Sequence, residues 1–259
     1  MEMKSYEHGV PSWVDLGTAD LDQAVDFYGA LFGWDVPEPN PDVGGYHWAM
    51  LKGRKVAGFG PQMNPGPPYW ATYISVESAA EVAATAVDNG GRTIVAPMDV
   101  LDLGHIAVLA DPQGAVFSIW QPGLHKGAGL ANEPGAFSWN ELLTTDVAGA
   151  TTFYSTVFGW EPETHGEAGS PGSYTEWKVG GRAIAGMMAK PPNMPSDVPS
   201  LWVVYFSVAD TDTAVARVSD LGGRLVMGPR DIQPGRFAVV ADPAGAVFNV
   251  IAVQAALTG

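Results

Sequence analysis

The 259-residue chain contains no cysteine, few basic residues and no long hydrophobic run. Without cysteine there is no disulfide, no thiolate metal ligand and no cysteine nucleophile. Thirteen basic residues against 28 acidic ones give a net charge of -15, which disfavours nucleic acid and anionic membranes as partners. No apolar segment approaches the roughly 18 residues of a membrane span, and no signal-peptide core is present. We therefore expect a cytoplasmic protein with no nucleic-acid or membrane partner.

Several catalytic signatures are also absent from the sequence. It contains no G-x-S-x-G nucleophile elbow, no P-loop, and no G-x-G-x-x-G between a strand and a helix. The composition is 46% hydrophobic and 10% aromatic, which suits a folded chain with substantial cores. At this length, two domains of ordinary size are expected.

An internal repeat spans most of the chain, with an offset that drifts only from 126 to 132 residues. Such self-similarity indicates two copies of one domain with small changes in loop length. We predict an N-terminal domain at residues 1–124, a Gly/Pro-rich linker at 125–135 and a C-terminal domain at 136–259. The paired segments are Trp13–Asp20 with Trp139–Asp146, Phe27–Trp34 with Phe153–Trp160, Trp70–Val76 with Trp202–Val208, and Asp111–Phe117 with Asp242–Phe248.

Each half also alternates twice between strand and helix patterns. A helical apolar stripe over 21–32 follows Asp20, which can cap it, and ends at Gly33. A second helix is expected at 79–89 and ends at Asn89-Gly90-Gly91. The expected strands of the first half are 12–17, 46–51, 55–60, 70–76, 93–97, 105–110 and 115–121. The pattern predicts βαβββ twice per half.

Four such units, with an FY…(L/V)FGW motif after the first strand and DP.GA.F before the last, resemble the vicinal-oxygen-chelate superfamily. That superfamily includes glyoxalases, bleomycin-resistance proteins and extradiol dioxygenases. The resemblance covers essentially the whole chain and is strongest to an actinobacterial tandem branch of glyoxalase-like and hydroxylase-like proteins, including accessory proteins of anthracycline pathways. It implies an α+β fold in which four βαβββ units form two tandem domains. It does not determine the chemistry, because one fold hosts many functions.

The resemblance also identifies the positions where metal-using relatives carry their ligands. Here those positions hold Trp13 and Trp139, Ala71 and Val203, and Ser118 and Asn249, and segments 54–60 and 182–188 contain neither His nor a carboxylate. A divalent metal needs several converging oxygen or nitrogen ligands, which these side chains do not supply. The five histidines do not recur at equivalent positions. We therefore predict no metal site and no cofactor.

In place of a metal, the resemblance and the two-residue period of strands imply a cupped sheet in each half, lined by aromatic and polar side chains. Such a lining suits a flat apolar ligand oriented by a few polar groups. The alternative is that the paired tryptophans are core residues kept by duplication. The candidate ligand-binding residues are Trp13, Trp48, Tyr73, Ser118, Trp120, Trp139, Glu176, Tyr205 and Asn249.

Asp15 and Glu141 are the candidate catalytic residues, because each is expected to face its cup beside a tryptophan. Burial in an apolar cup would raise the carboxyl pKa toward the range useful for proton transfer. The alternative is a structural hydrogen bond to nearby backbone or to an arginine.

Three functions remain open at this point. The first is metal-independent binding of an aromatic small molecule, with a cationic group favoured by the acidic chain, for sequestration, resistance or assistance to a partner biosynthetic enzyme. An anthracycline or another polyketide has these features. The second is a metal-free isomerase, cyclase, hydrolase or hydroxylase that uses Asp15 or Glu141 as general base, and the third is a metal-dependent glyoxalase or dioxygenase. A monomer and a homodimer are both compatible with the sequence.

Overall fold

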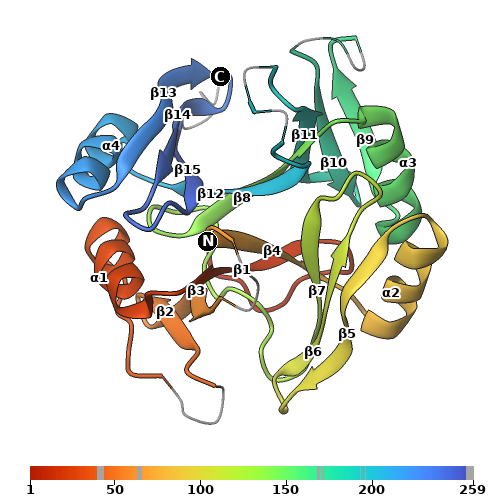
Figure 1. Cartoon of the computed structure of the whole chain (residues 1–259), viewed down its shortest axis with the longest axis horizontal. Coiled ribbons are helices and arrows are strands. Elements are labelled where there is room, and N and C mark those ends of the chain that lie inside the picture. Colours follow the sequence, from red (N-terminus) through yellow and green to blue (C-terminus); the bar gives the residue numbers. More distant parts are fainter. Residues whose placement is uncertain are drawn as a thin grey trace.

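The computed structural model describes the chain except residues 40–43, 63–65, 168, 169, 171, 193, 196 and 255–259. Its elements alternate between strands and helices twice in each half, as the sequence predicts (Figure 1). In the first half these are β1 Pro11–Thr18, α1 Leu21–Phe32, β2 His47–Leu51, β3 Arg54–Pro61, β4 Tyr69–Ser75, α2 Ala79–Asp88, β5 Arg92–Val100, β6 Gly104–Ala110 and β7 Val116–Pro122. In the second half they are β8 Phe137–Thr144, α3 Val147–Phe158, β9 Glu161–His165, β10 Tyr174–Val179, β11 Arg182–Ala189, β12 Leu201–Ser207, α4 Thr211–Asp220, β13 Arg224–Ile232, β14 Gly235–Ala241 and β15 Val247–Val253.

Each half forms one mixed sheet. The first sheet has the order β2-β3-β1-β4-β7-β6-β5, and the second has the order β13-β14-β15-β12-β8-β11-β10-β9. The α+β class and the tandem arrangement are therefore confirmed. The second sheet has one more strand because β9 pairs with β10, whereas the first unit has only an isolated bridge between Asp35 and Met50 in its place. The sequence did not predict β9, whose residues are all exposed and carry no apolar alternation.

The helix of the first unit begins and ends where the sequence predicts, and its counterpart in the third unit has the same caps. The side chains of Asp20 and Asp146 accept hydrogen bonds from backbone N–H groups in the first turn, at 3.0 and 2.9 Å. Both helices end at a glycine, Gly33 and Gly159, with φ of 72° and 70°. A residue with a Cβ atom is strained in this left-handed conformation, whereas glycine adopts it at little cost and so ends the helix.

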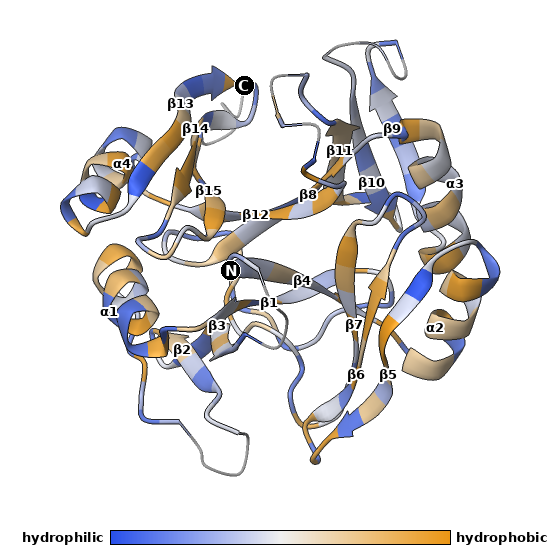
Figure 2. Ribbon diagram, viewed as in Figure 1, coloured by the Kyte–Doolittle hydropathy of each residue, from blue (hydrophilic) through white to orange (hydrophobic). Residues whose placement is uncertain are grey.

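The two sheets meet through their central strands, and their outer strands curve away from one another (Figure 1). Helix α1 lies beside α4, and α2 beside α3, so each pair joins the two halves. Both hydrophobic clusters draw on both halves of the chain: Tyr28 contacts Phe248 with ring centroids 5.3 Å apart, and Phe117 contacts Tyr154 at 5.7 Å. Hydrophobic residues follow one another along much of β6, β14 and β15 (Figure 2). The two halves therefore share their cores.

Two buried hydrogen bonds link the halves reciprocally. The Tyr28 hydroxyl donates to Asp242 in the second half, and the Tyr154 hydroxyl donates to Asp111 in the first, both at 3.1 Å. The other oxygen of each aspartate accepts backbone N–H groups of its own turn. The FY and DP.GA.F motifs are thus the two ends of one interdomain contact, which explains why both recur in both halves.

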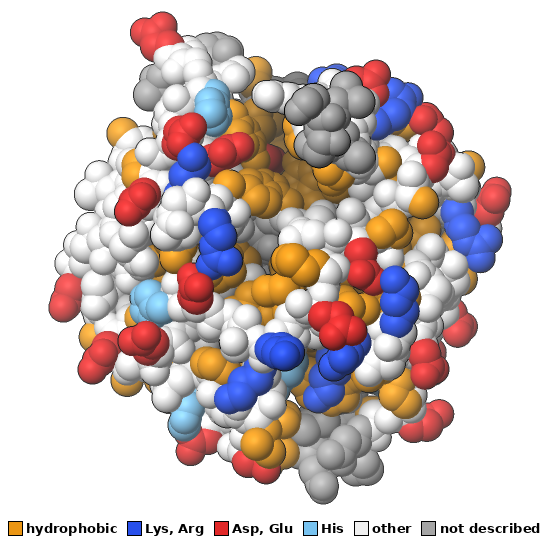
Figure 3. Space-filling model, turned by 180° about the vertical axis from the view of Figure 1, so that it is seen from behind, with side chains coloured by type: hydrophobic (Ala, Val, Ile, Leu, Met, Phe, Trp, Pro, Cys, Tyr) orange, Lys and Arg blue, Asp and Glu red, His pale blue; other side chains and the backbone are white. Residues whose placement is uncertain are grey.

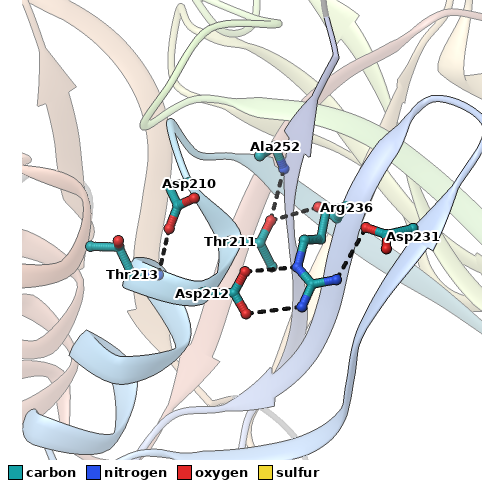
Figure 4. A network of polar contacts seen from close by, with 7 residues as sticks. All are labelled: Asp210, Thr211, Asp212, Thr213, Asp231, Arg236 and Ala252. Atoms are coloured by element: carbon teal, nitrogen blue, oxygen red, sulfur yellow. Dashed lines mark hydrogen bonds and ion pairs between the residues drawn. The ribbon is translucent and has the colours of Figure 1, made fainter.

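Surface ion pairs hold the outer hairpin of the last unit to its helix (Figure 4). Arg236 donates to both oxygens of Asp212, at the start of α4, and to Asp231 across the hairpin. The hydroxyl of Thr211 donates to the Arg236 carbonyl and accepts from the Ala252 N–H. In the first half, Asp99 and His105 form the equivalent cross-hairpin pair. These contacts fix the walls of each sheet and are remote from its concave face.

The segment between the two sheets is packed against the protein. Ala128, Leu130 and Ala131 are buried, and the Trp34 indole N–H donates to the Gly135 carbonyl at 2.6 Å. None of the helices in the described residues is long and apolar enough to cross a membrane.

We predict that Tyr28→Phe lowers the free energy of unfolding by about 1–3 kcal/mol, the usual cost of leaving buried polar groups unpaired. The substitution removes the partner of one Asp242 oxygen and of the Trp70 indole N–H, which donates to Tyr28 at 2.9 Å. Urea unfolding at pH 7 measures the change. Met98→Leu, at a residue that is 53% exposed, is the surface control and should stay within about 0.5 kcal/mol. Equal effects of the two substitutions would contradict this role of Tyr28.

Candidate functional site

The concave faces of the two sheets, called here the N-terminal cup and the C-terminal cup, each carry one carboxylate on the central strand. Asp15 lies on β1 opposite Gly58 of β3, and Glu141 lies on β8 opposite Gly186 of β11. Strand alternation places Trp13 on the same face as Asp15, and Trp139 on the same face as Glu141. The structure thus builds the two cups from equivalent positions of the repeat.

Two tyrosines bind the carboxylate of the N-terminal cup. The hydroxyls of Tyr46 and Tyr73 both donate to Asp15 Oδ2, at 3.0 and 2.7 Å. The indole N–H of Trp13 donates to the Tyr46 hydroxyl at 2.9 Å, and the Ser118 side chain hydrogen-bonds Tyr73. The result is a continuous chain of hydrogen bonds from tryptophan through tyrosine to carboxylate.

The C-terminal cup repeats this network with a longer acid. The Tyr205 hydroxyl donates to Glu141 Oε1 at 3.1 Å, and Tyr174 also hydrogen-bonds this carboxylate. Trp139 donates to the Tyr174 hydroxyl at 2.8 Å, and Asn249 hydrogen-bonds Tyr205. Asn249 therefore takes the place that Ser118 has in the first half.

A glycine makes room for one tyrosine in each network. A Cβ atom at Gly58 would overlap the Tyr46 hydroxyl, and one at Gly186 would overlap the Tyr174 hydroxyl. The tyrosine ring can therefore lie across the neighbouring strand and reach the carboxylate. Any larger residue at these two positions would displace the ring.

Burial raises the pKa of Asp15 to about 6 and that of Glu141 to about 6. The tyrosine hydrogen bonds act in the opposite direction, because they stabilise the ionised form. Burial, with the nearby carboxylates, raises the pKa of all four tyrosines above the usual value, so these hydroxyls remain donors. Each cup therefore holds one carboxyl that exchanges its proton near neutral pH.

This set of side chains does not fit a divalent metal ion. Each network offers one carboxylate, and its neighbouring oxygens belong to protonated tyrosines that already donate to it. A metal needs several ligands with free lone pairs directed at one point. Within the described part of the chain, no group of three or more His, Asp or Glu side chains is placed to hold an ion.

The N-terminal cup is filled at one end by His125, from the segment after β7. Its ring lies against the indoles of Trp13, Trp48 and Trp120, with centroids 4.6, 4.7 and 5.7 Å away. Trp13 is only 3% exposed as a result. The sequence does not predict a role for His125, because this residue has no counterpart in the repeat.

The described side chains leave the C-terminal cup open. Figure 3 shows a hollow in this half of the molecule, with hydrophobic side chains along its walls and charged ones on one rim. Glu141 lies on this face and is 7% exposed. Six apolar and aromatic side chains of the same face are partly exposed: Trp139, Tyr174, Met188, Val203, Phe237 and Val239. Trp202, Val204 and Ala238, which are next to them on the opposite face, are buried.

The structure brings the candidate residues together in two groups. Trp13, Trp48, Tyr73, Ser118 and Trp120 gather with Asp15 in the N-terminal cup. Trp139, Tyr205 and Asn249 gather with Glu141 in the C-terminal cup. Glu176 lies on the rim with a 34% exposed side chain, 3.8 Å from His165.

The partners of the two acids are neither backbone groups nor arginine but tyrosines. Two of these, Tyr46 and Tyr174, belong to the recurring stretches 46–48 and 174–176, which the sequence makes candidate walls of the cups. Their hydrogen bonds to the acids were not predicted, because they depend on strands that are distant in the sequence.

We predict that the Asp15 and Glu141 carboxyls titrate near pH 6 in the folded protein, as measured by carbon-detected NMR with assignments from Asp15→Asn and Glu141→Gln. Tyr205→Phe removes a hydrogen bond to ionised Glu141 and should raise its pKa further, while Asp15 stays unchanged. Tyr73→Phe is the matched control and should raise only the Asp15 pKa. Titration of either acid near pH 4 in the wild type would contradict the burial of that carboxyl.

Comparison with known proteins gives the family. A family model of the glyoxalase/bleomycin resistance protein/dioxygenase superfamily matches residues 136–250, and one of the glyoxalase-like domain matches residues 13–120. The chain is 41% identical to "Putative glyoxylase CFP32" of Mycobacterium tuberculosis, over 95% of both chains. It is 34% identical to the anthracycline biosynthesis protein DnrV of Streptomyces peucetius, over 97% of this chain and 96% of that one.

Solved structures share the fold at low sequence identity. The 2,3-dioxygenase LapB from Pseudomonas sp. KL28 aligns with a TM-score of 0.67 at 12% identity, over 96% of this chain and 94% of that one. The Mn(II)-bound glyoxalase from Novosphingobium aromaticivorans aligns with a TM-score of 0.65 at 14% identity, over 95% and 83%. With these matches over both halves, the chain belongs to the glyoxalase/bleomycin resistance protein/dioxygenase superfamily, as two tandem glyoxalase-like domains.

Proposed function

We propose that the C-terminal cup binds a hydrophobic aromatic small molecule, such as an anthracycline or another aromatic polyketide, without a metal ion. The observation that carries the proposal is a partly exposed aromatic and aliphatic face surrounding one buried carboxyl, that of Glu141. Binding would serve sequestration, resistance or assistance to a biosynthetic enzyme. Binding of a small molecule is the function expected of an apolar cavity with few convergent polar groups.

The lining favours a flat ring system. Trp139 projects from β8, Tyr205 from the adjacent β12, and Phe237 packs against Tyr205 with ring centroids 6.2 Å apart. Aromatic pairs contribute roughly 0.5–1.5 kcal/mol each beyond the burial of their area. A polycyclic ligand can contact several of these rings at once.

The charges of this half favour an amine on the ligand. Glu141 is ionised above about pH 6, and Glu176 lies on the rim two residues from Tyr174. Glu163 lies opposite Glu176 on the neighbouring strand, where it forms an ion pair with Lys178, and the chain as a whole carries a net charge of -15. A protonated amine would pair with a carboxylate at the site and be attracted by the surrounding field.

The relatives support this class of ligand. DnrV, and DauV of Streptomyces sp. (strain C5) at 34% identity, are both named anthracycline biosynthesis proteins. The glyoxylase name of CFP32 implies a different chemistry. The metal-dependent form of that chemistry requires ligands that the two cups do not offer.

We predict saturable binding of doxorubicin, an anthracycline with an amino sugar, to EDTA-treated protein by isothermal titration calorimetry. Trp139→Ala and Glu141→Gln should each weaken binding by about 10-fold or more, the usual effect of losing a stacking or charge-assisted contact. Affinity should rise between pH 5 and pH 7, because Glu141 ionises near 6 while the amine stays protonated. Glu141→Gln should remove this pH dependence.

Asp15→Asn, at the equivalent position of the other cup, is the matched control and should leave the affinity unchanged. Absence of binding by the wild type would refute the proposed function. Equal weakening by Asp15→Asn and Glu141→Gln would refute the assignment to the C-terminal cup.

A second candidate function is metal-free catalysis with Glu141 or Asp15 as general base. It is favoured by the pKa of about 6 in both carboxyls, which suits proton transfer at neutral pH. It covers isomerisation, cyclisation, hydrolysis and hydroxylation. Mass spectrometry of the recovered ligand distinguishes the two functions: an altered product that persists in EDTA and disappears in Glu141→Gln or Asp15→Asn would indicate catalysis, and an unchanged ligand would indicate binding alone.

A further inference from the structure

Three tryptophans of the N-terminal cup enclose one histidine ring. Trp13 from β1, Trp48 from β2 and Trp120 from β7 all contact the His125 imidazole, two of them with centroids closer than 5 Å. Trp13 and Trp48 also contact each other edge to face at 5.4 Å. The three indoles, called here the indole cage, therefore form a compact aromatic site with a ring already inside.

The backbone holds His125 in this position. Its N–H donates to the Leu103 carbonyl at 3.0 Å, and its carbonyl accepts the Trp120 indole N–H at 2.9 Å. The neighbouring Gly123 N–H donates to the same Leu103 carbonyl at 2.8 Å. The histidine is thus anchored at the rim of the cup through the loop that joins β5 and β6.

The occupant of the indole cage is a neutral heteroaromatic ring. His125 is 6% exposed, and its Nε2 has no hydrogen-bond partner among the described residues. Burial, and then the Lys55 ammonium, lower its pKa to about 3, so the ring is uncharged at neutral pH. Lys55 itself lies over the outer part of the cage, 3.6 Å from the centre of the Trp48 ring.

The second half does not reproduce this cage. The counterparts of Trp48 and Trp120 are Glu176 and Ile251, as the strand registers show. Trp139 keeps the position of Trp13 but is partly exposed. The residues that enclose His125 are therefore specific to the N-terminal cup.

We propose that the indole cage is a binding site for a small neutral heteroaromatic ring and that His125 occupies it as an internal ligand. The three indoles are thereby covered by a side chain of the protein itself and are not available to the ligand proposed above. The second part rests on the proposed function, whereas the first does not.

The first test uses free imidazole, which has the shape of the removed ring. In His125→Ala, imidazole should change the tryptophan fluorescence with half-saturation on the order of 1 mM, because five heavy atoms support only modest affinity. It should also raise the melting temperature of this variant, which gives a readout even if the substitution destabilises the fold. The wild type and His125→Phe should show neither effect, since a ring still fills the cage.

The exposed His105→Ala is the control for unspecific effects of imidazole. Equal responses in His125→Ala, His105→Ala and the wild type, or no response in any of them, would overturn the internal-ligand assignment.

The second test is the stoichiometry of doxorubicin binding to the wild type. One molecule per chain, lost in Trp139→Ala and kept in Trp13→Phe, is the expected result. A second molecule per chain that is lost in Trp13→Phe would show that the connector leaves the cage and would overturn its occupation by His125. No binding would refute the proposed function, while the imidazole experiment would still decide the role of His125.

Discussion

The reciprocal hydrogen bonds from Tyr28 to Asp242 and from Tyr154 to Asp111 are the constraint on which the arrangement of the two halves depends. One oxygen of each aspartate fixes its own turn, and the other oxygen binds the tyrosine of the opposite half. The structure of the turn and the contact between the halves therefore depend on the same side chain. Because the backs of the sheets are occupied by this shared core, only their concave faces remain for a ligand. The position of the cups is therefore a consequence of how the two repeats pack.

Within each cup, the hydrogen bonds to the carboxylate replace only part of the solvation that it would have in water, and this sets its pKa. The tyrosines stabilise the ionised form but do not offset the loss of solvation, and the pKa values of Asp15 and Glu141 remain near 6. A fully paired acid would be permanently charged, and an unpaired one in an apolar cup would be permanently neutral. A pKa near 6 lets the acid either pair with a cationic group or exchange a proton, so one geometry is compatible with both binding and catalysis.

The sequence predicted the elements well where a residue type has a direct conformational effect. Asp20 and Gly33 mark the ends of α1 because capping and left-handed geometry depend on few residues. It predicted less where a partner lies far away in the chain. Tyr46 and Tyr174 matter only because Gly58 and Gly186 open the adjacent strand, and His125 matters only because a connector turns back into the cup. Trp177, one position beyond the counterpart of Trp48, faces the core instead of the cup, since adjacent strand residues point to opposite sides.

Duplication produced two equivalent scaffolds, but the chain that follows each copy is different. After β7 the connector returns toward β8, and this path places the His125 ring in the first cup. The ring there contacts three indoles that water would otherwise cover. Covering the three indoles stabilises the fold by burying aromatic area. The second cup keeps apolar side chains exposed, which is unfavourable for stability unless an external molecule covers them. Under the proposed function, the same repeat supports a structural contact in one half and ligand binding in the other.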